Sequence, residues 1–240
     1  SLTTKYDLVP FGGKEQLCLN VQTPTQEIAF GSSGGRIYAW KPKRMESFVA
    51  SESFESDGLG KDLLWLPKPM RWSGDETQEY TLVECSNNGK EARIVYEAEF
   101  RNALPGLRLR KVYTVPSEGM SIHVEITLQN DTVDQVPLEL SYWSHHTFAQ
   151  PGAHFVEKEL LDPTRRGEDT LFTANGLQER TALPSMAVTG STGSSYAEFF
   201  PQSRSAVIFK VPPDFMAVHR WSHKSRALQS SEWILQPTLF

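Results

Sequence analysis

Hydrophobic and polar residues alternate along much of the chain. The clearest alternation spans residues 120–129, where polar residues separate an apolar row of Met120, Ile122, Val124, Ile126 and Leu128. Neighbouring side chains of a strand point to opposite faces, so this period of two predicts a half-buried strand. His123 belongs to the polar row, and we expect it to be exposed.

Similar runs lie on both sides of this strand. Residues 91–100 and 107–115 precede it and residues 138–148 follow it, with turn-forming residues such as Pro116-Ser-Glu-Gly119 between them. Four consecutive runs of this kind predict an antiparallel meander from about residue 90 to 148. Further short β-type runs lie at 35–40, 80–85, 206–211, 215–219 and 233–236.

The pattern as a whole is that of an all-β protein. No stretch combines a helical period with helix caps, and many strands with tight turns predict a large sandwich or barrel. The chain has 240 residues, which fits one large all-β domain as well as two small domains. The less regular segments, 41–78 and 149–195, are of the kind that more often border a site than link domains.

Composition and charge exclude several kinds of partner. A net charge of −5 leaves no basic surface of the type that binds nucleic acid. No apolar run approaches the ~18 residues that span a bilayer, so we expect no membrane partner. The first residues form no apolar signal segment, which favours a cytoplasmic protein, with a removed signal peptide as the alternative. Nothing in the pattern indicates an oligomeric state.

Cysteines and paired histidines give no sign of a metal site. Cys18 and Cys85 lack metal-type spacing, and we expect two buried free thiols rather than a disulfide. His219 and His223 are four residues apart, a spacing that suits a metal only on a helix, whereas they follow a strand-like run. We therefore expect no bound metal.

Aromatic and cationic residues gather between positions 63 and 72. Trp65 and Trp72 lie close in sequence to Lys68 and Arg71. Apolar ring faces beside hydrogen-bond donors suit a sugar, whose C–H face stacks on a ring while its hydroxyls bond laterally. The alternative is that both tryptophans anchor the core beneath a long loop, and composition by itself favours that alternative.

Two adjacent histidines end the run at 138–148. Counting by two places His146 on one face with Tyr142 and Phe148, where a packed histidine is expected. His145 falls on the other, more polar face beside Trp143. Strand parity therefore favours His145 as the histidine that faces a site.

The residues around this pair carry a family resemblance. Pro105-Gly106 precedes a strand, an amphipathic strand follows, and the last strand ends in Ser144-His-His-Thr-Phe-Ala-Gln-Pro-Gly152. This order resembles the central segment of the aldose 1-epimerases, in which the corresponding strand ends in Asn-His-Ser/Thr-Tyr-Phe-Asn-Leu-x-Gly. The resemblance implies an all-β fold, a large antiparallel β-sandwich of the galactose mutarotase-like type (a supersandwich), with residues 1–240 as a single domain. It also places the general acid of that family on His145.

The match weakens at both ends of the chain. Gly34-Gly35-Arg36-Ile37 is similar to the strand that opens the sandwich, and Trp233-Ile-Leu-Gln-Pro-Thr238 to the C-terminal strand. The latter strand carries the base glutamate of the family, but here the aligned residue is Gln236, and a neutral amide is no general base. Glu232 has the same strand parity but lies four residues earlier, so it could replace the base only if the strand bulges or the ligand shifts.

A second departure concerns the upstream histidine of the family. Its His-Gly-Gly segment has no counterpart in this chain, and the corresponding region runs from Trp65 to Trp72. Lys68 and Arg71 are the obvious polar substitutes there. The doubt about activity therefore falls on the base and on this histidine, and not on the acid.

Three readings stay open. In the first, the protein interconverts sugar anomers, with His145 as acid and Glu232 as base, and with a sugar contacted by Lys68, Arg71, Trp72, Trp143 and Gln236. Proton transfers on a positioned mono- or oligosaccharide need neither cofactor nor metal. In the second, the protein is a non-catalytic sugar-binding or accessory protein, because the amide of Gln236 still binds hydroxyls. In the third, the sandwich has no sugar role.

Overall fold

The computed structural model describes most of the N-terminal half of the chain and separate strands of the rest. The described residues are 1–66, 71–102, 105–131, 141–149, 153–156, 172–173, 176–177, 187–190, 195–200, 203–210, 218–223 and 229–235. In several later strands the description covers the backbone alone. Every helix or strand in this part of the chain is a β-strand, so the all-β prediction is confirmed.

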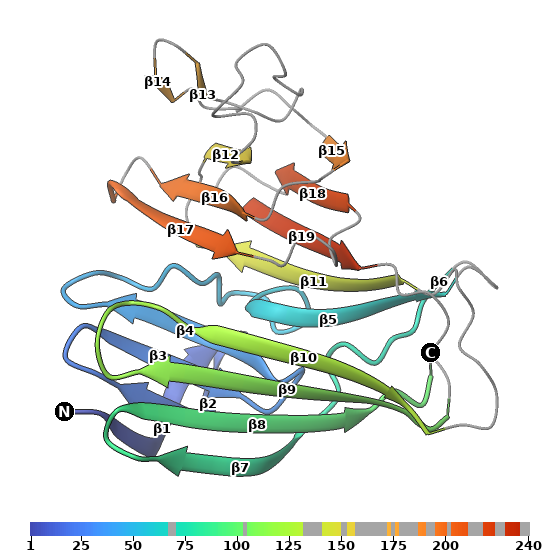
Figure 1. The fold of residues 1–240 in the computed structure, drawn as a ribbon, viewed down its shortest axis with the longest axis horizontal. Coiled ribbons are helices and arrows are strands. Elements are labelled where there is room, and N and C mark those ends of the chain that lie inside the picture. Colours follow the sequence, from blue (N-terminus) through green and yellow to red (C-terminus); the bar gives the residue numbers. More distant parts are fainter. Residues whose placement is uncertain are drawn as a thin grey trace.

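One large antiparallel sheet forms the first layer (Figure 1). In spatial order its strands are β1 (Thr3–Phe11), β2 (Lys14–Gln22), β3 (Gln26–Gly31), β4 (Arg36–Pro42), β5 (Leu59–Leu66), β11 (Ser141–Phe148), β19 (Gln229–Leu235), β18 (Val218–His223) and β15 (Ala187–Gly190). A short strand, β6 (Arg71–Trp72), pairs with β5. Strands β5, β11 and β19 are thus neighbours although they are far apart in sequence.

Smaller sheets complete the structure. The largest of them contains β10 (His123–Asn130), β9 (Leu107–Pro116), β8 (Glu91–Glu99) and β7 (Thr81–Asn87), in that order. A three-stranded sheet contains β12 (Ala153–Val156), β16 (Ser195–Phe200) and β17 (Ser205–Lys210), and β13 (Phe172–Thr173) pairs with β14 (Gly176–Leu177). All pairings between the described strands are antiparallel, as is usual in a β-sandwich.

The main hydrophobic core lies between the large sheet and the four-stranded sheet. Both sheets supply fully buried aromatic side chains to it, among them Phe30, Tyr96, Tyr113, Tyr142 and Phe148. The rings of Phe30 and Tyr113 meet across the two layers with centroids 4.8 Å apart. We call the face of the large sheet that points into this core its inner face. A smaller apolar cluster of Phe11, Cys18, Ala29, Tyr38 and Ala39 lies on the opposite, outer face.

A two-residue hairpin joins the first two strands. Gly12 and Gly13 have φ of 65° and 76°, the left-handed conformation that a type I′ turn requires at both central positions. A Cβ on Gly12 would lie 2.6 Å from Cβ of Phe54, so the close approach of that residue also requires glycine. The turn fixes Phe11 opposite Lys14 and thereby the register of the whole β1–β2 ladder.

The predicted meander is correct for three strands and wrong for the fourth. Strands β8, β9 and β10 pair in sequence order, as expected. The run at 138–148, described from Ser141, forms β11 and lies instead in the large sheet between β5 and β19. Its partners are far away in sequence, and a period of two says nothing about such partners.

Two further expectations are corrected. The segment 41–78, expected to be irregular, contains β5 and β6, and Trp65 lies directly opposite Trp72 in that pair. Cys18 is buried as expected, but Cys85 is exposed, and both thiols are free. Burial, with a smaller contribution from Asp7, raises the pKa of the Cys18 thiol to about 12. His123 is exposed, as the alternation predicts.

Candidate functional site

The histidine pair lies on β11, which has a neighbouring strand on each side in the large sheet. In the β11–β19 ladder His145 lies directly opposite Glu232, and in the β5–β11 ladder it lies directly opposite Lys61. Arg220 of β18 in turn lies opposite Glu232. Directly opposite positions of antiparallel strands belong to the same face, with Cα atoms about 4.5–5.5 Å apart. Four charged or titratable positions therefore form one row across four strands.

A bulge in β5 sets this register. Pairing shifts between His145 and His146, so that His145 lies opposite Lys61 while His146 lies opposite Leu59. Gly60 is the additional residue, and its φ of 79° is in the left-handed region that favours glycine. Bulges re-aim side chains, and this one brings Lys61 onto the outer face beside His145.

His146 is a packed residue of the inner face. Its Nδ1 accepts a hydrogen bond from the backbone N–H of Gly60 at 3.1 Å, so its Nε2 carries the proton and donates to Oγ of Ser144 at 3.2 Å. Its ring centroid is 4.8 Å from that of Phe209. Both nitrogens are used structurally, in agreement with the parity argument that assigned His146 to packing.

His145 lies on the outer face, beneath the segment that links β4 to β5. The residue is 2% exposed, so this face is covered and not open as its polar sequence suggested. Its outer-face neighbours are bonded to that segment. Oγ1 of Thr147 donates to the carbonyl of Ser56 at 3.1 Å, and Nζ of Lys61 donates to the carbonyl of Glu55 at 2.9 Å.

Arg36 holds the covering segment in place. Its guanidinium donates to the carbonyls of Asp57 and Phe54, each at 2.6 Å, and lies over the rings of Phe11, Tyr38 and Phe54. Burial lowers the pKa of Arg36, and contacts with Tyr38 and nearby carboxylates partly offset that shift. Because this cation is fully buried and bonded to backbone, the segment above His145 is anchored from below.

The carboxylate of Asp57 stabilises the same segment from within. Its Oδ2 accepts hydrogen bonds from the backbone N–H groups of Glu52 and Ser53, at 2.9 and 2.8 Å. Two charge-assisted bonds to one carboxylate oxygen fix the turn at 52–57. The segment that covers His145 is therefore folded and has its own hydrogen bonds.

A buried polar network lies on the inner face directly beneath this site. Asp62 of β5 forms an ion pair with Lys111 at 2.5 Å and accepts hydrogen bonds from Tyr80 at 2.9 Å and Tyr142 at 2.5 Å. Nζ of Lys111 also donates to the carbonyl of Gly60 at 2.6 Å. Lys111 and Tyr142 join β5 to β9 and β11, and Tyr80, directly before β7, adds a third contact, so the network holds the bulge in position.

Burial controls the proton equilibria of this network. It raises the pKa values of Tyr80 and Tyr142 well above the ordinary 10.0, and the adjacent carboxylate of Asp62 adds to the shift. The hydroxyl of Tyr113 donates to the carbonyl of Gly35 at 2.7 Å, and burial together with Asp62 raises the pKa of Tyr113 in the same way. For Lys111 burial lowers the pKa, with the Asp62 pair acting in the opposite direction.

Of the other predicted site residues, some have a described backbone and some lie outside the described residues. Lys68 and Gln236 are outside the described residues. Arg71 and Trp72 form β6, where Arg71 lies opposite Leu66. The backbone of Trp143 is described in β11, two positions before His145 and on the same face of the strand by parity.

Lys61 and Arg220 were not found by sequence reasoning. Each lies in a strand whose pairing with β11 or β19 depends on contacts between distant parts of the chain. No local signal marks either residue. The register alone places them in the row with His145 and Glu232.

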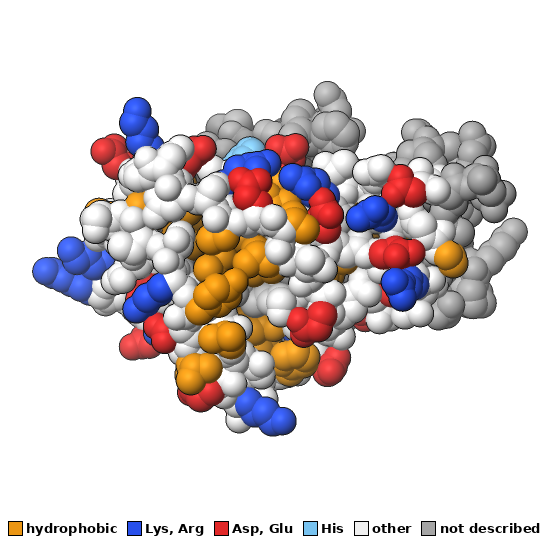
Figure 2. All heavy atoms as spheres, turned by 90° about the horizontal axis from the view of Figure 1, so that it is seen from below, with side chains coloured by type: hydrophobic (Ala, Val, Ile, Leu, Met, Phe, Trp, Pro, Cys, Tyr) orange, Lys and Arg blue, Asp and Glu red, His pale blue; other side chains and the backbone are white. Residues whose placement is uncertain are grey.

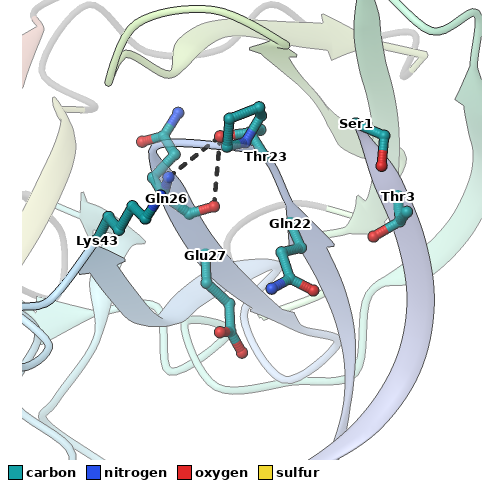
Figure 3. Close-up of a pocket in the computed structure, with 8 residues that line it drawn as sticks. Ser1, Thr3, Gln22, Thr23, Gln26, Glu27 and Lys43 are labelled. Atoms are coloured by element: carbon teal, nitrogen blue, oxygen red, sulfur yellow. Dashed lines mark hydrogen bonds between the residues drawn. The ribbon is translucent and has the colours of Figure 1, made fainter.

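A separate pocket lies at the opposite end of the large sheet. It has a volume of about 400 Å³ and lies where β1, β2 and β3 meet (Figure 3), with a lining of Ser1, Thr3, Gln22, Thr23, Pro24, Gln26, Glu27 and Lys43. Among these residues none is a histidine, so the pocket offers no counterpart to the row at His145. Among the described residues, no group of three or more histidine, cysteine, aspartate or glutamate side chains could hold a metal ion. The same part of the chain contains no helix long and apolar enough to cross a membrane.

Comparison with known proteins assigns the architecture. No protein-family model matches the chain, and no curated protein matches its sequence. A galactose mutarotase-like protein from Clostridium acetobutylicum aligns over 97% of this chain and 88% of its own, with a TM-score of 0.66 and 12% identity. A protein of Escherichia coli K12 provisionally assigned as an aldose 1-epimerase aligns over the same shares, with a TM-score of 0.54 and 12% identity. Likenesses at this identity establish architecture and not activity. The chain therefore has the galactose mutarotase-like fold that its central motif resembles.

Proposed function

We propose that the protein is carbohydrate-active and interconverts the anomers of an aldose by general acid–base catalysis. The observation that carries the proposal is the β11–β19 register, in which Glu232 lies directly opposite His145. A histidine and a carboxylate at neighbouring positions on one face are the minimum that ring opening requires. The mutarotase-like fold of the chain agrees with a sugar as substrate.

The two proton transfers of anomer exchange take place around one carbon. His145 protonates the ring oxygen while Glu232 removes the proton of the anomeric hydroxyl, and the bond between C1 and the ring oxygen breaks. The aldehyde rotates, the ring closes on its other face, and both protons return. Since the two oxygens involved are bonded to the same carbon, acid and base must be close neighbours. Directly opposite positions meet this condition, whereas positions four residues apart on a strand lie roughly 13 Å apart.

Glu232 therefore needs no strand bulge to act as base. The family resemblance aligned the base with Gln236, which cannot accept a proton. The position of Glu232 directly opposite His145 supports Glu232 as the base instead. In this assignment Gln236 and the cationic and aromatic residues of 65–72 contact sugar hydroxyls, and no metal or cofactor takes part.

A sugar-binding protein without catalysis is the second candidate. It is favoured by the amide at position 236 and by the covered position of His145, which is 2% exposed. Such a protein would bind sugars through hydroxyl contacts and leave anomer exchange at its spontaneous rate.

Exchange NMR separates the two candidates. We expect the wild-type protein to accelerate anomer interconversion of at least one aldose in a panel, and His145→Ala to lower the rate by roughly 10²–10⁴-fold. Sugar binding with exchange at the buffer rate would support the binding protein. Neither binding nor exchange across the panel would reject both candidates.

A further inference from the structure

Exposed apolar side chains gather at the β1 end of the large sheet. Tyr6 and Leu8 of β1 and Leu17 of β2 are 62%, 59% and 66% exposed, and Leu8 lies directly opposite Leu17. Tyr6 lies opposite Leu19, a core residue, so these side chains are on the inner face. Seen from the side of β1 and β7, hydrophobic side chains form a band on the surface (Figure 2). Contiguous apolar bands of this kind mark interaction surfaces.

The same strand offers unused backbone hydrogen bonds. Among the described strands, β1 pairs with β2 alone and ends the sheet. In a two-residue hairpin the residues that flank the turn, here Phe11 and Lys14, exchange both backbone hydrogen bonds. Every second pair along the ladder does the same, so the odd-numbered residues of β1 bond to β2. The N–H and C=O groups of Thr4, Tyr6 and Leu8 then point to the free edge. In agreement, the N–H of Leu8 bonds to the carboxylate of its neighbour Asp7 at 2.9 Å and to no strand.

From this edge we propose that the protein forms a two-fold symmetric dimer in which β1 pairs with β1 of a second copy, antiparallel and centred on Tyr6. Thr4 then lies opposite the partner's Leu8, and Tyr6 opposite the partner's Tyr6. All three residues direct their backbone groups to the edge, so each pair is a hydrogen-bonded one. The large sheets of the two copies become one continuous sheet.

Charge complementarity selects this register. Lys5 and Asp7 are exposed on the outer face, with side chains 57% and 47% exposed. Centring on Tyr6 places Lys5 opposite the partner's Asp7 on both sides of the axis, and opposite charges across a ladder are favourable. Centring on Lys5 or on Asp7 would place two lysines or two aspartates opposite each other at the two-fold axis, which is unfavourable.

Centres at the neighbouring edge-facing residues are less favourable. Centring on Leu8 would place Tyr6 opposite the partner's Pro10, which has no N–H to donate. Centring on Thr4 would place Lys5 opposite the partner's Thr3, so the pairing of Lys5 with the partner's Asp7 would be lost. The register centred on Tyr6 avoids both losses and places the exposed Leu8 of each copy opposite Thr4 of the other. In this pairing a bond to the partner's backbone replaces the bond from the N–H of Leu8 to Asp7.

Charge exchange tests the register directly. Sedimentation velocity over a concentration series should show wild-type dimers. Asp7→Lys alone places Lys5 opposite a second lysine, and Lys5→Asp alone places two aspartates opposite each other. We expect each variant to raise the dimer dissociation constant at least tenfold, a change of ~1.4 kcal/mol. Mixing the two variants should restore dimers, because lysines of one chain then meet aspartates of the other.

Controls separate this interface from others. Ile208→Lys replaces an apolar residue of β17 that is 64% exposed and lies outside the proposed interface, and it should leave dimerisation unchanged. Tyr6→Lys, which would place two lysines opposite each other at the two-fold axis, should weaken dimers. Circular dichroism and thermal unfolding would confirm that each variant is folded. A protein that stays monomeric at every concentration would overturn the proposal. So would dimers indifferent to the charge variants, or variants that mixing fails to rescue.

Discussion

Two adjacent histidines in one strand have separate roles because each points to a different face. His146 is bonded through both nitrogens to inner-face partners, whereas His145 belongs to the outer-face row. Parity along β11 predicts this division from sequence. The covering of His145 by the segment at 51–58 could not be predicted, because the hydrogen bonds that anchor it come from Arg36 and Thr147, far away in sequence.

The packing role of His146 is testable by stability. His146→Ala leaves the N–H of Gly60 without its acceptor in a buried position, which costs about 1–3 kcal/mol. Urea unfolding should show this loss. The control is His123→Ala at an exposed histidine, where a change within about 0.5 kcal/mol is expected. Equal stabilities of the two variants would show that the bond to Gly60 contributes nothing.

At the level of elements, periodicity predicts strands but not their neighbours. β8, β9 and β10 were predictable as a meander because each follows its partner after a short turn. β11 was predictable as a strand, yet its place between β5 and β19 depends on pairings across long stretches of chain. β1 to β3 escaped prediction, and β1 is mostly exposed, so no alternation of apolar and polar residues marks it.

The bulge in β5 is the element on which the site register depends. Gly60→Ala adds a Cβ in a left-handed conformation, 3.2 Å from the hydroxyl oxygen of Tyr113. Gly89→Ala is a matched control, since Gly89 has a similar φ of 82° and nothing within 4 Å of its added Cβ. Gly89→Ala should lower the free energy of unfolding by about 1 kcal/mol through backbone strain alone, and Gly60→Ala should lower it by more. Chemical denaturation that gives equal losses would contradict a crowded bulge.

For the whole molecule, the all-β class follows from the alternation, and the sandwich type from the central motif. The candidate acid was also predictable, because the motif and strand parity both select His145. The proposed base was harder to predict. Glu232 was identified through its parity, but its position opposite His145 depends on the β11–β19 register, which local sequence does not encode.

The buried tyrosines should limit stability of the whole fold at alkaline pH. Tyr80, Tyr113 and Tyr142 have pKa values raised well above 10.0, so they keep their protons in the folded state while unfolded tyrosines ionise. Their contribution is present below about pH 10 and is lost as the pH rises towards the folded values. The lowered pKa of Lys111 acts in the opposite sense, but only below 10.5.

Denaturant unfolding at increasing pH checks this sign. Stability should fall once the pH exceeds about 10.5, and the phenolate absorbance of the buried tyrosines should appear together with unfolding. Tyr142→Phe, which removes one of these groups, should make the fall shallower. Stability that is constant or rising in this range would contradict the raised pKa values.

The central claim is that Glu232, opposite His145, is the base of an anomerase. The most direct measurement is the exchange-NMR rate of anomer interconversion for Glu232→Gln, compared with the wild type at saturating aldose. We expect a loss of roughly 10²–10⁴-fold with sugar binding retained. The wild-type protein should be active without a glutamate at position 236, where the resemblance aligned the base. Adding Gln236→Glu to Glu232→Gln should therefore not restore the rate. A Glu232→Gln protein with the wild-type rate would contradict the account.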